Sequence, residues 1–433
     1  MPDIGRESIL RNQKDRHMRW SRLDNAATIF PPTSHGSDTG VFRLSCELRE
    51  DVQPERLQLA LEQTLEDFPH MKSRLRRGVF WYYLEQSSWP LHVVPEQNPP
   101  CARLYRGSRS PLLEVSFWRH KINLDIFHVL ADGVGAISFF QALIIRYLEL
   151  LTPGAEEARR PEISPEARGE DGFARYYKPG SGQYGSQRRA YCLKGARRRD
   201  GALTILEGVA DVDQILRAAH SHNTTLTVYL CAVLIQAIRD EMAEKDLRRP
   251  VVLTIPVDLR SYFKTDTARN FFGIMRVSYD FSHGSGAFEE ILETVAAQFQ
   301  KELTAERLGA RMNALSGLQH QPLLRVVPLV LKNPILRLSG EISSLGETAT
   351  LSNIGRFRLP EALAPHVRGF GVFMSTHCTQ ICTCTFGKEF HMGFTSVLRD
   401  PNVQRRFFQR LHQDGIELEI RSNAFYRDAE GGV

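Results

Sequence analysis

The chain has 433 residues, of which 42% are hydrophobic and 24% charged, and its formal net charge at pH 7 is +5. This length favours two domains over one hydrophobic core, and the composition excludes disordered and fibrous classes. So small a positive charge on so long a chain does not indicate a nucleic-acid surface; it is compatible with anionic ligands or with solubility alone.

The distribution of hydrophobic residues indicates neither secretion nor a membrane span. Residues Met1–Glu7 are polar and provide no apolar signal segment. The most apolar windows, Val134–Leu151 and Leu323–Leu338, are interrupted by charged residues, and the second also by prolines. Seven cysteines, an odd number, favour reduced thiols. We therefore expect a cytoplasmic protein.

The first half of the chain predicts strands alternating with two long helices. The helix after Pro54 has leucines at four-residue steps, and Pro54 suits a first-turn position. The expected elements are strands at 41–48, 79–84, 112–118 and 122–127, and helices at 54–68 and 134–151. The aromatic residues of the 79–84 strand are expected to pack in a sheet.

The second half repeats this mixture after a segment rich in Pro, Gly, Glu and Arg at about 152–201, which indicates a linker. The expected strands are 203–209, 251–257, 274–281, 370–375, 380–386 and 389–395, the last three as antiparallel neighbours; the expected helices are 211–220, 232–242, 288–308, 323–338 and 401–414. The similar content of the two halves predicts a pseudo-duplicated α/β protein.

A group of sulfur and imidazole side chains near the C-terminus raises the question of a metal site. The group consists of His377, Cys378, Cys382, Cys384 and His391. Its spacing matches no common zinc pattern, and the last two cysteines alternate with threonines as on the two faces of a strand. We expect buried thiols in a β-hairpin and no bound metal.

The most informative stretch surrounds His128. An apolar strand, Ile122–Phe127, ends at this histidine, and Asp132-Gly133 then opens a helix. Catalytic and binding residues often lie where a core strand ends and a helix follows. A single histidine there can also be a core residue with hydrogen-bonded ring nitrogens and no catalytic role.

The spacing His128-x-x-x-Asp132-Gly133 resembles the HxxxDG signature of the thioester-dependent acyltransferase superfamily. That superfamily includes chloramphenicol acetyltransferase, plant BAHD acyltransferases, alcohol acetyltransferases and the condensation domains of nonribosomal peptide synthetases. Three further segments resemble it in order, at 256–260, 269–271 and 351–355. The resemblance extends over about residues 20–420.

The resemblance implies an α/β fold of two chloramphenicol-acetyltransferase-like lobes, each a mixed sheet packed with helices, with the active site at the lobe interface. The N-terminal lobe would span residues 1–180, including the linker from about 152. The C-terminal lobe would span 181–433, with a bridging segment near 348–360.

The resemblance also implies an acyltransferase. The acyl group would come from a CoA or carrier-protein thioester, with acyl-CoA or acyl-phosphopantetheine as co-substrate, no permanently bound cofactor, and an acyl carrier protein as a possible partner. Amide-forming condensation domains usually carry a histidine where this chain has Phe127, which favours an alcohol over an amine acceptor. Two alternatives stay open: an amide-forming condensation enzyme, and a non-catalytic carrier-binding module.

His128 is the expected general base, since a neutral imidazole at pH 7 can accept the acceptor's proton. A backbone carbonyl is expected to hold its other nitrogen. By resemblance, Asp132 is structural and pairs with Arg260. Gly133, and less so Gly135, would let the backbone turn tightly and approach the ligand.

Three further residues are candidates for contact with the substrates. Ser352 and Asn353 lie in the segment that, by resemblance, bridges the lobes beside the histidine, and they could donate hydrogen bonds to an oxyanion or make turn hydrogen bonds only. Asn270 is a weaker candidate for the acceptor channel.

Overall fold

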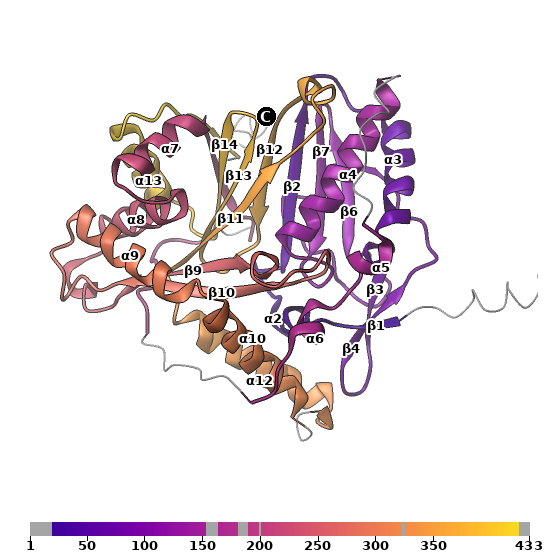
Figure 1. Cartoon of the computed structure of the whole chain (residues 1–433), viewed down its shortest axis with the longest axis horizontal. Helices are drawn as coiled ribbons and strands as arrows, with labels where there is room; N and C mark the ends of the chain where they lie inside the picture. The colour runs from indigo at the N-terminus through magenta and orange to yellow at the C-terminus, as the bar shows by residue number, and fades with distance from the viewer. Residues whose placement is uncertain (1–19, 153–162, 181–188, 199–200, 322–324, 424–433) are drawn as a thin grey trace, which may run out of the picture.

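The computed structural model describes residues 20–152, 163–180, 189–198, 201–321 and 325–423. Figure 1 shows two sheets side by side, each covered by helices, with a smaller group of strands and helices below them. The predicted α/β fold of two sheet-plus-helix lobes is confirmed.

The first lobe is a five-stranded sheet in the order β12-β2-β7-β6-β5. Helices α3 and α4 pack on it and on each other (Figure 1). Its elements are β2 (Val41–Leu48), α3 (Pro54–Asp67), β5 (Val94–Pro95), β6 (Leu113–Trp118), β7 (Lys121–Phe127), α4 (Gly133–Leu151) and β12 (Val367–Met374). The predicted strand-to-helix transition at His128 is therefore present.

The second lobe is a seven-stranded sheet in the order β10-β9-β11-β13-β14-β8-β15, with its own hydrophobic core. Its strands are β8 (Thr204–Asp211), β9 (Val251–Asp258), β10 (Phe272–Tyr279), β11 (Ala349–Phe357), β13 (Thr379–Phe386), β14 (Glu389–Ser396) and β15 (Glu419–Ser422). Its helices are α7 (Val212–Ser221), α8 (Leu226–Arg239), α9 (Phe288–Glu302) and α13 (Asn402–Gln413).

A third, three-stranded sheet in the order β1-β4-β3 lies below the first lobe (Figure 1). It consists of β1 (Trp20–Arg22), β3 (Ser73–Arg77) and β4 (Tyr82–Gln86). The short helices α2 (Phe30–Thr33), α5 (Pro165–Arg168) and α6 (Gly172–Tyr176) and the longer α10 (Ala305–His320) and α12 (Leu329–Ser344) lie at the same end.

The expectation that the last three predicted strands are antiparallel neighbours is wrong for the first of them. β13 and β14 pair with each other, but β12 pairs antiparallel with β2 in the other sheet. β12 crosses close to β14: a Cβ at Gly393 would lie 2.3 Å from the carbonyl oxygen of Val372. Local hydrophobic pattern does not encode a strand's partner, so the sequence alone could not separate these arrangements.

Two helix predictions also need correction. The predicted helix 288–308 is two helices, because α9 ends at Glu302 and α10 begins at Ala305. The predicted 323–338 helix begins after Pro328 and runs to Ser344, with Pro334 inside it. The strand predicted at 79–84 also differs, since β4 begins at Tyr82.

Among the described residues, one helix, α4, is long and apolar enough to cross a membrane, and more than half of its most apolar stretch is buried inside the protein. Its buried side chains belong to the core of the first lobe.

Candidate active site

His128 follows the last residue of β7 and is held between the two lobes. Its backbone N–H donates to the carbonyl of Gly40 at 2.9 Å. Its ring stacks on Phe30 with centroids 4.4 Å apart, and it contacts Phe42 of β2 and Phe272 of β10. Since Phe272 belongs to the second sheet, side chains from both lobes surround the ring, and His128 as a residue is 9% exposed.

Asn270 fixes the orientation of the His128 ring. The side-chain oxygen of Asn270 lies 2.9 Å from Nδ1 of His128, and its amide nitrogen donates to the His128 carbonyl at 2.9 Å and to Asp24 at 3.3 Å. With the nitrogen used on these two acceptors, the oxygen faces Nδ1, so Nδ1 carries the proton. Nε2 is then the unprotonated nitrogen, able to accept a proton.

This geometry corrects the expectation that a backbone carbonyl holds Nδ1: a side-chain amide does so instead. The weaker candidate Asn270 is thus a direct partner of His128. The sequence identifies the Arg269-Asn270-Phe271 segment, but its pattern gives no sign that the asparagine reaches the histidine.

Burial lowers the pKa of His128 below its ordinary value of 6.5, despite the opposing influence of Asp132 and the hydrogen bond to Asn270. The neutral imidazole is therefore the stable form at neutral pH.

Asp24 is a site residue that the sequence did not single out. It is fully buried, accepts from the backbone N–H of Ala27 at 2.8 Å and pairs with Arg269 at 3.6 Å. Burial raises its pKa to about 7, although Arg269 acts in the opposite direction. Asp24 lies in a short polar stretch, which carries no local sign of burial in the sequence.

Asp132 begins α4 and joins it to the second lobe. One carboxylate oxygen accepts from the backbone N–H of Gly135 at 2.9 Å, which caps the helix, and the other accepts from the N–H of Phe271 at 2.7 Å. Arg260 donates to both oxygens, at 2.9 and 3.1 Å. The ion pair expected from the resemblance is thus present, and both side chains are at least nine-tenths buried.

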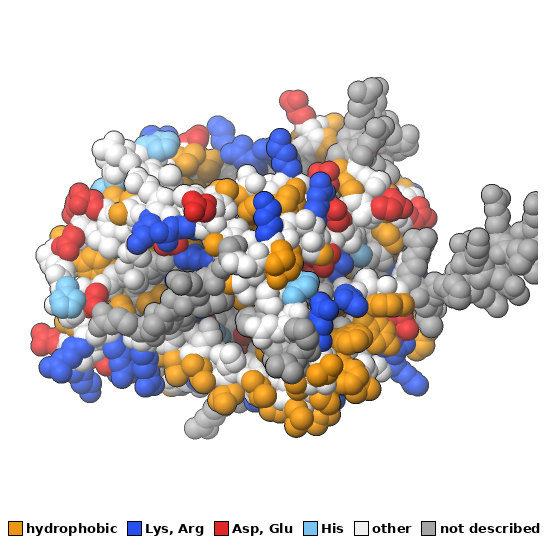
Figure 2. All heavy atoms as spheres, turned by 60° about the horizontal axis from the view of Figure 1, so that its bottom comes forward, with side chains coloured by type: hydrophobic (Ala, Val, Ile, Leu, Met, Phe, Trp, Pro, Cys, Tyr) orange, Lys and Arg blue, Asp and Glu red, His pale blue; other side chains and the backbone are white. Residues whose placement is uncertain are grey.

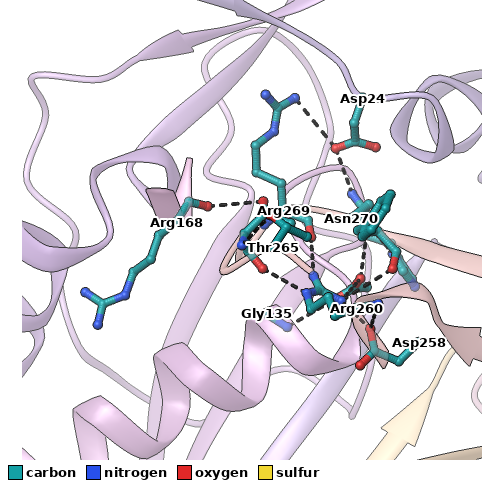
Figure 3. Close-up of polar contacts among 12 residues, drawn as sticks. Asp24, Gly135, Arg168, Asp258, Arg260, Thr265, Arg269 and Asn270 are labelled. Atoms are coloured by element: carbon teal, nitrogen blue, oxygen red, sulfur yellow. Dashed lines mark hydrogen bonds and ion pairs between the residues drawn. The ribbon is translucent and has the colours of Figure 1, made fainter. Parts of the chain in front are cut away.

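Arg260 lies at the centre of a polar network (Figure 3). Besides Asp132, it donates to the carboxylate of Asp258 at 2.9 Å and to the carbonyls of Thr267 and Arg269 at 2.9 and 2.6 Å. The guanidinium therefore holds the loop that carries Asn270 in a fixed position against the start of α4.

The two glycines at the start of α4 have different constraints. A Cβ at Gly135 would lie 1.9 Å from the carbonyl oxygen of Ala268, whereas one at Gly133 would first meet a methyl group of Ile354 at 3.1 Å. Gly135 therefore allows the two backbones to approach, whereas the predicted approach of Gly133 to a ligand stays a prediction.

Ser352 and Asn353 lie on β11, whose later residue Ile354 faces Gly133. The amide of Asn353 is exposed and donates to the hydroxyl of Thr227 at 3.3 Å. Ser352 is partly buried. Contact of either side chain with His128 is absent from the described interactions, so their role as oxyanion donors stays a prediction.

The seven cysteines of the chain are free thiols. Cys382 and Cys384 are buried in β13, as predicted, and burial raises the pKa of both thiols. Across the described ranges, no group of three or more His, Cys, Asp or Glu side chains is placed to hold a metal ion.

A cavity of about 410 Å³ opens beside the motif. It is lined by Pro31, Ser34, Thr39, Arg103, Tyr105, Arg106 and Phe127. Phe127 is buried and stacks on Tyr105, with ring centroids 5.9 Å apart. The residue preceding the histidine is thus a wall of this cavity, while His128 is not among its lining residues.

Comparison with known proteins gives one family match and many structural matches. Residues 209–382 match the model of the phthiocerol/phthiodiolone dimycocerosyl transferase C-terminus. No curated protein sequence matches significantly.

Three solved structures illustrate the structural likeness. TRI101 of F. graminearum with coenzyme A and deoxynivalenol aligns with a TM-score of 0.62 and 11% identity, over 89% of this chain and 96% of that one. TRI3 trichothecene 15-O-acetyltransferase of Fusarium sporotrichioides aligns with a TM-score of 0.56 and 12% identity, over 92% of this chain and 97% of that one. The starter condensation domain of rhizomide synthetase RzmA, a mutant in complex with C8-CoA and Leu-SNAC, aligns with a TM-score of 0.56 and 12% identity. The alignment covers 95% of this chain and 96% of that one.

At these identities the structures show a shared fold, and the family model adds a match in sequence over the segment that contains Arg260 and Asn270. This chain therefore shares the two-lobed fold of these acetyltransferases and condensation domains, and its residues 209–382 are similar in sequence to the C-terminal part of an acyltransferase family.

Proposed function

We propose that this protein transfers an acyl group from a CoA or carrier-protein thioester to an alcohol, with Nε2 of His128 as the general base. The observation that carries the proposal is the hydrogen bond from Nδ1 of His128 to Asn270, which leaves Nε2 unprotonated. Burial, which lowers the pKa of His128, keeps the ring in this neutral form.

In the proposed reaction Nε2 accepts the proton of the acceptor hydroxyl while the oxygen attacks the thioester carbonyl carbon. The resulting tetrahedral intermediate collapses as the C–S bond breaks. The departing thiolate takes the proton from the imidazolium, so the free thiol and the ester leave and the neutral histidine is restored. Asp132 acts through Arg260 to position the loop of Asn270, and is not itself a proton acceptor.

The choice of an alcohol acceptor rests on Phe127 and on the compounds named for the related structures. TRI3 is named as a 15-O-acetyltransferase, and the rhizomide synthetase domain was solved with C8-CoA. Phe127 is buried against Tyr105, so the position that carries a second histidine in amide-forming relatives holds an apolar ring here. We propose a cytoplasmic location, with an acyl carrier protein as an alternative source of the thioester.

The decisive experiment measures thiol release from a panel of acyl-CoA donors in the presence of alcohol and amine acceptors. His128→Ala should lower kcat by about 10²–10⁴-fold, the usual contribution of a positioned general base. The substitution also removes a buried ring that packs on three aromatic side chains, so the melting temperature should fall, and kcat is compared at a temperature at which both proteins are folded.

The panel also separates the alternatives. Thiol release with amines but not alcohols would favour the amide-forming condensation reaction. Binding of an acyl carrier protein without turnover in either case would favour the non-catalytic module. Turnover that is unchanged in His128→Ala would contradict the proposed mechanism.

A further inference from the structure

Helix α12 exposes apolar side chains along most of its length. Five of them are more than half exposed: Val330, Leu331, Ile335, Leu338 and Ile342. Four of these recur at steps of four, three and four residues, so they form one stripe on the helix. A helix in a soluble protein normally turns such a stripe inward.

The opposite side of α12 is already attached to the protein, so the stripe cannot simply rotate inward. Leu329 is buried, and Asn333 donates to the hydroxyl of Tyr82 at 2.7 Å. A Cβ at Gly340 would lie 2.9 Å from a methyl group of Thr33, which shows how closely the helix lies on α2.

A second apolar segment continues the stripe. The turn between β3 and β4 exposes Val79, Phe80 and Trp81. It is joined to α12 by two hydrogen bonds, from the backbone N–H of Leu329 to the Val79 carbonyl at 2.8 Å and from Nζ of Lys332 to the Phe80 carbonyl at 2.9 Å. Figure 2 shows hydrophobic side chains gathered along the lower part of this face. We call the stripe and the turn together the apolar face.

Cations border the aromatic end of the apolar face. Arg22 lies over the ring of Trp81 at 5.9 Å, and Arg77 is exposed at the start of the turn. Lys332 belongs to α12, and its side chain extends to the turn, where it donates to the Phe80 carbonyl. The acidic residue on the exposed side of α12, Glu341, is paired with Arg337 at 3.3 Å.

From this arrangement we infer that the apolar face docks the protein on the surface of an anionic lipid bilayer, with α12 lying in the plane of the membrane. At 16 residues α12 is about 24 Å long, shorter than the roughly 30 Å hydrocarbon core, so it cannot span it. Apolar side chains flanked by tryptophan and basic residues are the composition of in-plane membrane helices.

The charges favour a bilayer over a second copy of the chain. In a two-fold dimer centred on the stripe, the aromatic end of one copy would lie against the far end of α12 in the other. Arg22, Arg77 and Lys332 would gain no free acidic partner there, because the acidic residue of α12, Glu341, is already paired with Arg337. An anionic headgroup layer instead complements them.

The test is sedimentation with vesicles of phosphatidylcholine containing about 30% phosphatidylglycerol, compared with vesicles of phosphatidylcholine alone. The wild-type protein should bind the anionic vesicles, more weakly at high salt. Leu331→Glu/Ile335→Glu should lower the partition coefficient at least about tenfold, because it removes two inserted side chains and adds two negative charges.

The matched control is Leu59→Glu/Ile420→Glu, which adds the same charge at exposed apolar positions of α3 and β15 and should bind like the wild-type protein. If the glutamate variant does not fold, Leu331→Ser/Ile335→Ser replaces it. The inference would be overturned if the wild-type protein did not bind anionic vesicles. It would also be overturned if Leu331→Glu/Ile335→Glu bound them as strongly as the wild-type protein. A wild-type dimer that the double variant converts to a monomer, without vesicle binding, would show instead a contact between two copies. This readout needs no acyltransferase activity, so it is independent of the proposed function.

Discussion

At the scale of single residues, the site depends on one amide. Asn270 uses its oxygen on Nδ1 of His128 and its nitrogen on two acceptors, so its two ends have separate tasks. A change at this position can therefore alter the protonation of the histidine without touching the ring. This provides a test of whether His128 titrates during the reaction.

The first residue-scale prediction concerns pH. In the wild-type protein the acidic limb of kcat/KM should lie below pH 6.5, because burial lowers the pKa of His128 and activity requires the neutral ring. Asn270→Asp places a carboxylate beside Nδ1, favours the imidazolium and should move this limb upward by about 1–2 pH units. A pH profile of kcat/KM, measured with the acceptor well below its KM, checks it. A limb that does not move would mean that another group controls the profile.

The second residue-scale prediction concerns the two glycines. Gly135→Ala should prevent folding or lower the free energy of unfolding by more than about 3 kcal/mol, because its Cβ would overlap the carbonyl oxygen of Ala268, a backbone atom. Gly133→Ala is the matched control and should be tolerated better, since its neighbour is a side-chain methyl group of Ile354. Urea unfolding of both variants measures the difference. Equal losses would show that the close approach at Gly135 is not the reason for its glycine.

At the scale of elements, the ion pair between Asp132 and Arg260 joins the N-terminus of α4 to the loop that follows β9. Asp132 also accepts two backbone hydrogen bonds, and Arg260 donates to three backbone carbonyls. The pair thus connects the start of α4 with residues 258–271, which are distant from it in the sequence.

Asp132→Asn should lower the free energy of unfolding by at most about 3–5 kcal/mol, the usual cost of breaking a buried ion pair; the loss is reduced because Arg260 keeps Asp258 as a partner. Activity should fall with it, because the loop of Asn270 loses its anchor. Calorimetry and thiol release on the same preparation measure both effects. Arg260→Lys serves as a control that keeps the charge but not the paired hydrogen bonds. If Asp132→Asn is as stable as the wild-type protein and only slower, the aspartate takes part in the chemistry instead.

At the scale of the whole molecule, the two lobes are connected in ways that a boundary in the sequence does not describe. β12 comes from the C-terminal half but completes the first lobe's sheet on β2. β11 belongs to the second sheet, while Phe357 at its end packs into the first core. The division at 180/181 therefore stays a prediction.

His377, between β12 and β13, adds an electrostatic link. Its Nδ1 lies 3.6 Å from Asp38, which precedes β2, and its Nε2 lies 3.2 Å from Glu347, which precedes β11. The hydrogen bonds to Asp38 and Glu347 raise the pKa of His377 to about 9.

Because the folded protein holds this proton more tightly than the unfolded chain, the link contributes its full stability below about pH 6.5, and that contribution is lost as the pH rises through 9. His377→Gln should therefore melt below the wild-type protein at pH 6, and the difference should shrink by pH 10. Melting temperatures of both proteins across this range check the prediction. A difference that does not depend on pH would show that the imidazolium does not stabilise the contact.

The sequence by itself determined the α/β class, the strand that ends at His128, the helix that Asp132 opens, and the pairing of Asp132 with Arg260 implied by the family resemblance. These features follow from local periodicity, capping and a motif whose residues are close in the chain.

Only the tertiary structure decided which group holds Nδ1 of His128, where β12 pairs, that Asp24 is buried, and that the stripe on α12 faces outward. Each depends on contacts between residues far apart in the chain, and a local pattern of apolar and polar residues does not specify which distant segment supplies the partner.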